Sequence, residues 1–201
     1  MLMKNKILEY LKNYNVSLID HRQRKMAKMI RGYNYILDLG FAANPNPYLN
    51  NNHVVGVDIM EIEKPENYSE VIFDDVITLR SFIKENSVDA ILCGELLEHL
   101  ENPFELLKSC NKVLSEEGIL VLSTPNPHYI GEILLTMCMI KKLFYTRNHF
   151  CLYPQRWLIR MLERAGFKNV RIYAGGIKIP YLGTIPFFRT FGLYTIALAK
   201  K

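Results

Sequence analysis

The 201-residue chain is 49% hydrophobic, 22% charged and 11% aromatic, an ordinary globular composition that excludes a largely disordered or fibrous protein. One domain is the expectation for this length. The chain has no recognisable secretory signal and no uninterrupted apolar run of about 20 residues. Its four cysteines form no C-x-x-C pair, so we expect a reduced, cytoplasmic protein without a thiolate zinc site.

Charge is unevenly distributed along the chain. Residues 1–31 carry a net charge of +6, residues 32–118 one of −11 and residues 119–201 one of +10, which gives +5 in total. Fields from like charges add over a cleft, so these blocks are consistent with two binding functions on one surface. Solvated faces of ordinary helices are the alternative interpretation.

Apolar residues in the first thirty positions recur at near-helical spacing and predict one or two amphipathic helices: Leu8, Leu11, Met26, Met29 and Ile30. Seven apolar runs then predict strands. In chain order these are Tyr35–Leu39, His53–Ile59, Val71–Phe73, Val88–Cys93, Gly118–Ser123, Val170–Tyr173 and Tyr194–Leu198. Such nearly continuous apolar runs are typical of parallel strands with helices on both faces.

Two helices between these strands have clear start and stop signals. Asn102 as N-cap, Pro103 at the first position and Glu105 as capping-box partner begin one helix, which Gly118 ends. The other occupies residues 154–166 and is predicted to turn four apolar side chains inward: Trp157, Leu158, Met161 and Leu162. Strands alternating with helices predict an α/β fold with a doubly wound, mostly parallel seven-stranded sheet.

The carboxyl ends of the strands are the candidate ligand site of such a sheet. Asp38-Leu39-Gly40 ends the first strand, and Asp58 ends the second. A glycine turn followed by an acidic residue can hold an adenosine, because the backbone approaches closely and a carboxylate accepts hydrogen bonds from the ribose hydroxyls.

Two features favour a cationic adenosine cofactor over a dinucleotide. Only Gly40 stands where the dinucleotide fingerprint has three glycines, and Pro45 and Pro47 interrupt the helix whose N-terminus would hold a pyrophosphate. Asp38 places negative charge at the turn, which repels a diphosphate and suits a ligand with an ammonium and a sulfonium.

Four sequence blocks follow one another along the chain: Asp38-Leu39-Gly40, Val55-Gly56-Val57-Asp58-Ile59, Asp75-Val76 and the stretch Asp89–Leu100. In this order they resemble the class I S-adenosylmethionine (SAM)-dependent methyltransferases, in the group that modifies small molecules and glycans. Leu162–Phe167 adds to the resemblance. It implies the Rossmann-like methyltransferase fold with an antiparallel last strand, SAM as cofactor and S-adenosylhomocysteine as product.

The resemblance also implies roles for particular residues. Asp58 binds the ribose, Asp75 meets the adenine amino group, and the fourth block contacts the methionine part of the cofactor. The expected cofactor-binding residues are Asp38, Gly40, Ala42, Asp58, Ile59, Asp75, Val76, Gly94 and Glu95. Ala42 and Asn44 stand where the family has its second and third glycines, and the short interval between the first two strands predicts a short or absent helix there.

Three histidines are candidate catalytic bases for an oxygen acceptor, because imidazole titrates near neutral pH: His128, His99 and His149. Glu95-x-x-Glu98-His99 also resembles the metal-binding element of small-RNA 2′-O-methyltransferases. Those enzymes have a further histidine-rich element, whereas here only His128 and His149 follow, at unmatched spacing. We therefore expect no metal site.

Residues 1–201 are predicted to form a single domain with a helical cover (1–31), a cofactor-binding half (32–123) and an acceptor-side half (124–201). An apolar insertion near residues 129–145 is expected to cover the acceptor pocket and to rest on a membrane surface. Core packing of this insertion is the alternative. The expected location is therefore the cytoplasm, with peripheral contact at the inner membrane surface.

The predicted function is SAM-dependent methyl transfer to a small-molecule or glycan acceptor, with oxygen as the expected methylated atom. Basic residues of the acceptor-side half predict an anionic acceptor: Arg147, Arg156, Arg160 and Lys178. Two alternatives stay open, a cofactor-binding pseudoenzyme or scaffold and an RNA-directed methyltransferase. The chain has no recognisable RNA-binding module, so nucleic acid is not the expected partner. The acceptor's identity and the oligomeric state do not follow from the sequence.

Overall fold

The structure, a computed structural model, describes residues 19–129, 133, 137, 149–175, 177–179, 183–185 and 192–201. Residues 19–29 are helical. The strands are β1 (Tyr35–Leu39), β2 (His53–Asp58), β3 (Glu70–Phe73), β4 (Val88–Gly94), β5 (Leu114–Pro125), β6 (Lys168–Ala174), β7 (Ile177–Ile179), β8 (Gly183–Ile185) and β9 (Tyr194–Lys200). The labelled helices are η1 (Val76–Ser81), η2 (Leu97–His99), α2 (Pro103–Val113) and α5 (Gln155–Arg164).

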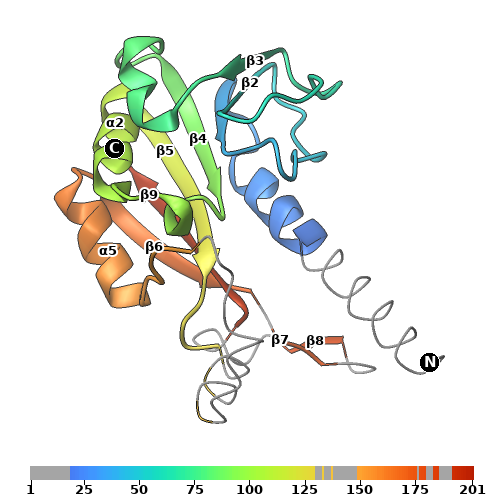
Figure 1. Ribbon diagram of the computed structural model, residues 1–201, viewed down its shortest axis with the longest axis vertical. Coiled ribbons are helices and arrows are strands. Elements are labelled where there is room, and N and C mark those ends of the chain that lie inside the picture. Colours follow the sequence, from blue (N-terminus) through green and yellow to red (C-terminus); the bar gives the residue numbers. More distant parts are fainter. Residues whose placement is uncertain are drawn as a thin grey trace.

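Seven strands form one sheet in the order β3-β2-β1-β4-β5-β9-β6 (Figure 1). The strands from β3 to β5 pair in parallel, whereas β9 is antiparallel to both of its neighbours, β5 and β6. This arrangement confirms the predicted α/β fold with a doubly wound, mostly parallel seven-stranded sheet and an antiparallel last strand. A separate two-stranded hairpin of β7 and β8, which the sequence did not predict, also occurs.

Alternate residues of the buried strands face two separate layers of the core. Leu37, Val55 and Ile91 belong to the layer that also holds apolar residues of α2 and α5. Their neighbours Ile36 and Val54 belong to the other layer, with Met26 and Ala27 of the helix of residues 19–29 and with Ile30 directly after it. Figure 1 accordingly shows α2 and α5 on one side of the sheet and residues 19–29 on the other. Both faces are covered, which explains why the strands are apolar throughout.

The predicted boundary between the helix that begins at Pro103 and the fifth strand was wrong. Helix α2 ends at Val113, and β5 begins at Leu114, which pairs with Val88. Gly118 lies inside β5, at a tight position where a Cβ would meet the Ser115 carbonyl oxygen at 2.8 Å. The glycine therefore accommodates an irregular start of the strand and does not end a helix. At the other end of α2, Asn102 is the N-cap residue and Pro103 begins the helix, as predicted, but the Asn102 side chain makes no capping hydrogen bond.

One inward-facing prediction for α5 was also wrong. Leu158 and Leu162 are buried and Met161 is half-buried, but Trp157 is 63% exposed. Successive helical residues are about 100° apart around the axis, so Trp157 turns out of the face that Leu158 occupies. The Arg160 guanidinium instead lies over the indole, with its Cζ 5.8 Å from the centroid of the Trp157 ring.

The interval after β1 contains no helix across residues 40–52, as predicted from its length. Most of the expected insertion near residues 129–145 lies outside the described residues, as do residues 1–18. Within that insertion residues 133 and 137 are helical, and both Ile133 and Met137 are exposed. Among the helices that the structure describes, none is long and apolar enough to cross a membrane.

Candidate active site

A cavity of about 170 Å³ opens at the carboxyl ends of β1 and β4. The order of the sheet reverses between these two strands, which is where ligands bind in doubly wound folds. The predicted residues Asp38, Gly40, Gly94 and Glu95 all line this cavity. These four residues thus lie together at the strand ends, and their contact with a cofactor stays a prediction.

Gly40 makes the sharp turn at the end of β1. Its φ of +71° is a left-handed conformation that favours glycine. Its N–H donates to the Val57 carbonyl at 2.9 Å, so the turn stays joined to β2. At the end of the neighbouring strand, Glu95 has φ of +53° directly after β4. A non-glycine residue in this conformation stores strain, a feature that clusters at functional sites.

The helix of residues 19–29 belongs to the predicted helical cover, but the sequence analysis did not include it in the cofactor site. Arg22, Gln23 and Met26 line the cavity. The Gln23 amide nitrogen donates to the carbonyls of Asn44 (2.7 Å) and Pro45 (3.2 Å), which attaches the helix to the loop after β1. In the sequence, the spacing of the apolar residues in the first thirty positions indicated only an amphipathic helix. No sequence signal showed which strand ends that helix would cover.

Arg22 brings a positive charge into the cavity. Its guanidinium lies 3.4 Å from Oε1 of Glu95, while its Nε is buried without a hydrogen-bond partner. A buried N–H of this kind is costly unless a ligand satisfies it. The α-carboxylate of a bound amino acid is the group that a guanidinium matches best.

Asp38 is a buried carboxyl group in the floor of the cavity. Burial raises the pKa of Asp38 to about 7, and the nearby charge of Asp58 also raises it, whereas a hydrogen bond from Tyr68 acts in the opposite direction. A cationic ligand would favour the ionised form of this carboxyl.

Asp58 is buried at the end of β2 and does not line the cavity. Its two carboxylate oxygens accept hydrogen bonds from the backbone N–H groups of Ala42 and Met60, each at 2.9 Å. Asp58 therefore holds the loop after β1 against β2, and each oxygen keeps a lone pair for a further donor. The next residue, Ile59, is 75% exposed and presents an apolar surface at the same strand end.

Asp75 follows β3, and its side chain accepts a hydrogen bond from the Ile77 N–H at 2.9 Å. It thereby caps η1, while the neighbouring Val76 is buried in the core. Neither residue lines the cavity. The adenine contact predicted for Asp75 stays a prediction.

Two of the three candidate histidines lie together at the rim of the cavity. His99 lines the cavity, and its ring centroid is 4.7 Å from that of His149. The His149 segment is attached at this point because the Phe150 N–H donates to the Glu98 carbonyl at 2.7 Å. Burial lowers the pKa of His149, and the neighbouring charge of His99 lowers it further.

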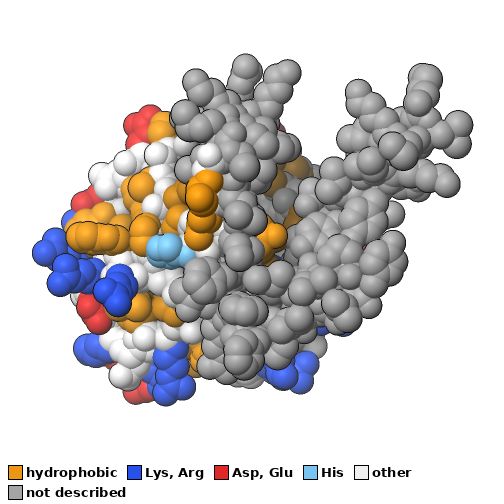
Figure 2. Space-filling view, turned by 90° about the horizontal axis from the view of Figure 1, so that it is seen from below, with side chains coloured by type: hydrophobic (Ala, Val, Ile, Leu, Met, Phe, Trp, Pro, Cys, Tyr) orange, Lys and Arg blue, Asp and Glu red, His pale blue; other side chains and the backbone are white. Residues whose placement is uncertain are grey.

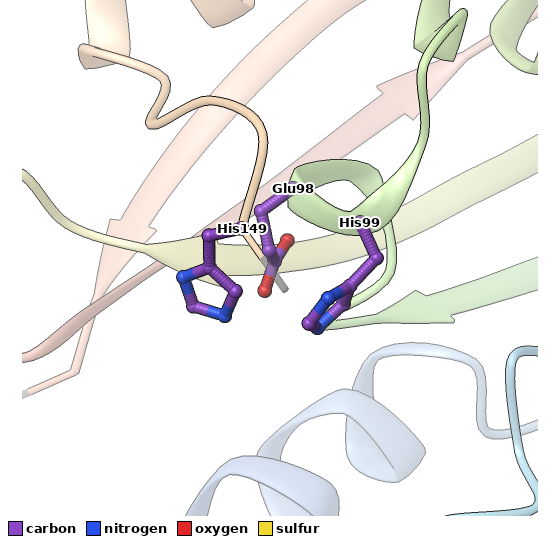
Figure 3. A group of neighbouring side chains, drawn as sticks. All are labelled: Glu98, His99 and His149. Carbon is purple, nitrogen blue, oxygen red and sulfur yellow. The ribbon is translucent and has the colours of Figure 1, made fainter. Parts of the chain in front are cut away.

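Glu98 adds a fully buried carboxyl group beside these rings. Its Oε2 accepts from the Thr124 hydroxyl at 3.2 Å, and its Oε1 has no hydrogen-bond partner. Burial and the nearby charge of Glu95 raise the pKa of Glu98 to about 8. Figure 3 shows the three side chains converging from η2 and from the segment before α5.

His128, the third candidate, is exposed in the turn after β5 and does not line the cavity. Its backbone N–H donates to the Asn126 side chain at 3.1 Å. The Asn126 amide nitrogen also donates to the Gly192 carbonyl at 2.7 Å. In this turn Asn126 has a structural role.

Features in the cavity and at the neighbouring end of β2 match the parts of SAM. An unsatisfied guanidinium N–H suits its carboxylate, a buried aspartate suits its ammonium and sulfonium, and an exposed isoleucine at the β2 end suits its adenine ring. Gly40 allows close approach of the backbone. These residues therefore fit the expected cofactor.

Comparison with known proteins supports this interpretation. Residues 12–172 match the family model described as methyltransferase domain. In fold, the chain is similar to a SAM-dependent methyltransferase from Archaeoglobus fulgidus, with a TM-score of 0.71 and 22% identity over 92% of this chain and 94% of that one. A SAM-dependent methyltransferase from Thermotoga maritima has a TM-score of 0.68 and 17% identity over 96% of both chains.

Similarity to curated relatives is local. The ubiquinone biosynthesis O-methyltransferase of Glaesserella parasuis is 39% identical over 56 residues, which are 25% of this chain and 24% of the relative. The corresponding protein of Histophilus somni is 28% identical over 71 residues, or 35% of this chain and 30% of the relative. The chain thus covers less than a third of these relatives. The family match shows that the chain belongs to the methyltransferase domain family, and its fold is that of solved SAM-dependent methyltransferases.

Proposed function

We propose that the protein methylates an oxygen atom of a small-molecule or glycan acceptor that binds at the rim formed by Glu95, His99 and His149. The observation that carries this proposal is that His99 lines the cofactor cavity and also contacts His149. An acceptor hydroxyl at this rim would lie beside the methyl donor and beside two imidazoles. An oxygen acceptor has a proton to lose, and imidazole is well suited to assist that loss.

The local relatives support an oxygen acceptor. The proteins from Glaesserella parasuis and Histophilus somni are both named O-methyltransferases. Their similarity to this chain extends over short segments, so it suggests the methylated atom and leaves the acceptor's structure open.

The chain's own residues then have distinct tasks. Arg22 binds the cofactor carboxylate, Asp38 faces its cationic groups, and Asp58 accepts from the ribose hydroxyls. Ile59 packs on the adenine, and Asp75 accepts from the adenine amino group. When bound, SAM supplies the methyl group and a good leaving group, so positioning of the acceptor provides much of the catalysis.

The acceptor proton is the task of the histidine pair. Burial and the charge of His99 both lower the pKa of His149, so near neutral pH its imidazole is in the unprotonated form that can accept a proton. Its half-buried position next to the cofactor cavity keeps it accessible to an acceptor.

The test is transfer of labelled methyl from SAM to a panel of phenols, glycans, amines and RNA, with product analysis by mass spectrometry. We expect O-methylated products from phenols or glycans, and His149→Ala should lower the rate by about 100-fold or more. His53→Ala is the matched control and should retain activity, because His53 lies at the start of β2, away from the strand end that carries Asp58. Exclusive N-methylation or RNA methylation would contradict the proposal, and SAM binding without transfer would indicate a binding protein.

A further inference from the structure

The carboxylate of Glu98 and the imidazoles of His99 and His149 form a compact group of potential ligands. One ligand atom from each residue lies within 4.8 Å of the others. We propose that these three side chains bind a divalent transition-metal ion at the rim of the cofactor cavity. The sequence analysis expected no metal site here, because His149 follows His99 only after 49 intervening residues.

The distances are close to those of an assembled site. Metal–nitrogen and metal–oxygen bonds of about 2.0–2.2 Å place two ligand atoms at most about 4.4 Å apart. Each side chain therefore has to move by only about an ångström or less to surround an ion. Figure 3 shows the Glu98 carboxylate between the rings of His99 and His149.

The orphaned oxygen of Glu98 is an independent observation that points to a ligand. Glu98 is fully buried, and its Oε1 has no hydrogen-bond partner among the described residues. A buried acceptor left in this state is costly. The other oxygen, Oε2, accepts from Thr124 at 3.2 Å, which orients the carboxylate and leaves Oε1 to coordinate an ion. Partners of this kind are typical around metal ligands.

The backbone already holds the two halves of the site together. The Phe150 N–H donates to the Glu98 carbonyl at 2.7 Å, and the Tyr153 hydroxyl donates to the Leu97 carbonyl at 3.4 Å. His149 is thus attached directly beside η2. A preformed ligand set loses less entropy when it binds an ion.

The ligand types select the class of ion. Two imidazoles and one carboxylate suit Zn²⁺, Fe²⁺, Mn²⁺ or Co²⁺, whereas Mg²⁺ and Ca²⁺ prefer ligands that are all oxygen. Three protein ligands also leave at least one coordination position for a water molecule or an acceptor.

The role of this ion, unlike its binding, rests on the proposed function. A hydroxyl of the acceptor at the open position would have a lowered pKa, as metal-bound water does, and would lose its proton to solvent water. The ion would then replace direct proton removal by His149. His99 lines the cofactor cavity, so a metal-bound oxygen would lie beside the methyl donor.

The binding test uses the full chain after removal of metals with a chelator. Zn²⁺ is titrated calorimetrically, and Co²⁺ is followed by its visible absorption spectrum. We expect one ion per chain and a Co²⁺ spectrum of low-coordinate nitrogen and oxygen ligands. Glu98→Gln and His149→Ala should each weaken binding by at least about tenfold, whereas His53→Ala should bind as the unaltered protein does.

Parallel measurements separate the possible failures. Circular dichroism and SAM binding show whether a variant is folded, and His149→Ala replaces Glu98→Gln if the buried substitution prevents folding. No one-to-one binding by the unaltered protein, or equal binding by the unaltered protein and His149→Ala, would overturn the site. Intact metal binding with chelator-insensitive methyl transfer would overturn the role alone, and transfer to nitrogen alone would contradict the proposed function but leave the site standing.

Discussion

The hydroxyl group of Tyr68 donates a hydrogen bond to Oδ2 of Asp38, and both side chains are buried. The phenol therefore satisfies one oxygen of the carboxyl group in the floor of the cofactor cavity. Burial still dominates, so the pKa of Asp38 is raised to about 7. We therefore expect cofactor binding to depend on pH in the neutral range.

We predict that SAM affinity rises by about tenfold from about pH 6 to about pH 8, because the cationic cofactor favours the ionised form of Asp38. Titration calorimetry at constant ionic strength measures this change. Asp38→Asn keeps an acceptor for Tyr68 but cannot ionise, so it should bind SAM more weakly at about pH 8 and show a smaller pH dependence. An equal pH dependence in both proteins would contradict the prediction.

The same carboxyl group affects stability without ligand. The pKa of Asp38 in the folded state, about 7, lies above its ordinary value of 3.8, so the folded chain binds this proton more tightly than the unfolded one. Its contribution is therefore present at low pH and is lost as pH rises toward and through 7. Asp38→Asn should be more stable than the unaltered protein at about pH 8 by about 2–4 kcal/mol, measured by urea unfolding, and the difference should shrink toward about pH 5. If the difference in unfolding free energy between the two proteins stayed constant across this pH range, ionisation of the buried Asp38 would not be its cause.

Asp58 has a double role that determines the best substitution. Because its oxygens hold the Ala42 and Met60 N–H groups, Asp58→Ala would disrupt the loop as well as the expected ribose contact. Asp58→Asn keeps one carbonyl acceptor and removes the charge. We expect this change to weaken the binding of both SAM and S-adenosylhomocysteine by about tenfold or more. The midpoint of urea unfolding shows whether the variant keeps its fold. Unchanged affinity for both would exclude Asp58 from the cofactor site.

Gly40 and Gly32 allow a matched test of the turn after β1. Both have positive φ, +71° and +94°, but a Cβ on Gly40 would lie 2.9 Å from the Leu96 side chain, whereas a Cβ on Gly32 would meet nothing within 4 Å. Each change to Ala should cost about 1–2 kcal/mol from the left-handed backbone alone. Gly40→Ala should also weaken SAM binding, and Gly32→Ala should leave it unchanged. Equal SAM affinities in the two variants would contradict a role for Gly40 in the site.

Prediction from the sequence succeeded where the pattern is local. The buried strands are continuous apolar runs, so their positions, and the strand-end residues Asp38, Gly40 and Glu95, could be located from the chain alone. The failures depend on tertiary structure. A glycine such as Gly118 can mark the end of a helix or an irregular position within a strand, and the local sequence does not distinguish the two. The placement of Arg22 over the cavity, and of His149 beside Glu98, depends on how distant segments pack, which no spacing encodes.

The charge of the acceptor is the last prediction. Exposed Arg156 and Arg160 lie on α5 in the half of the chain with net charge +10. Arg160 and Arg164 also line a second cavity of about 340 Å³ together with Trp157. Figure 2 shows that Lys and Arg side chains lie next to hydrophobic ones on the lower face of the molecule. Such a surface suits an acceptor with an anionic group and an apolar or ring-shaped part, since arginine binds phosphate and carboxylate groups in a bidentate manner.

We expect phosphorylated or carboxylated acceptors to have a lower KM than their neutral counterparts, and this preference should weaken as salt screens the charges over about 8 Å at physiological ionic strength. Arg160→Ala should raise KM for the anionic acceptor with little change in kcat, because a charge remote from the reacting atoms contributes to binding of the substrate and the transition state alike. Lys84→Ala, an exposed cation of the cofactor-binding half, is the control and should leave both constants unchanged. Equal KM values for the charged and neutral acceptors at every salt concentration would show that the basic residues of α5 serve only to keep an exposed helix solvated.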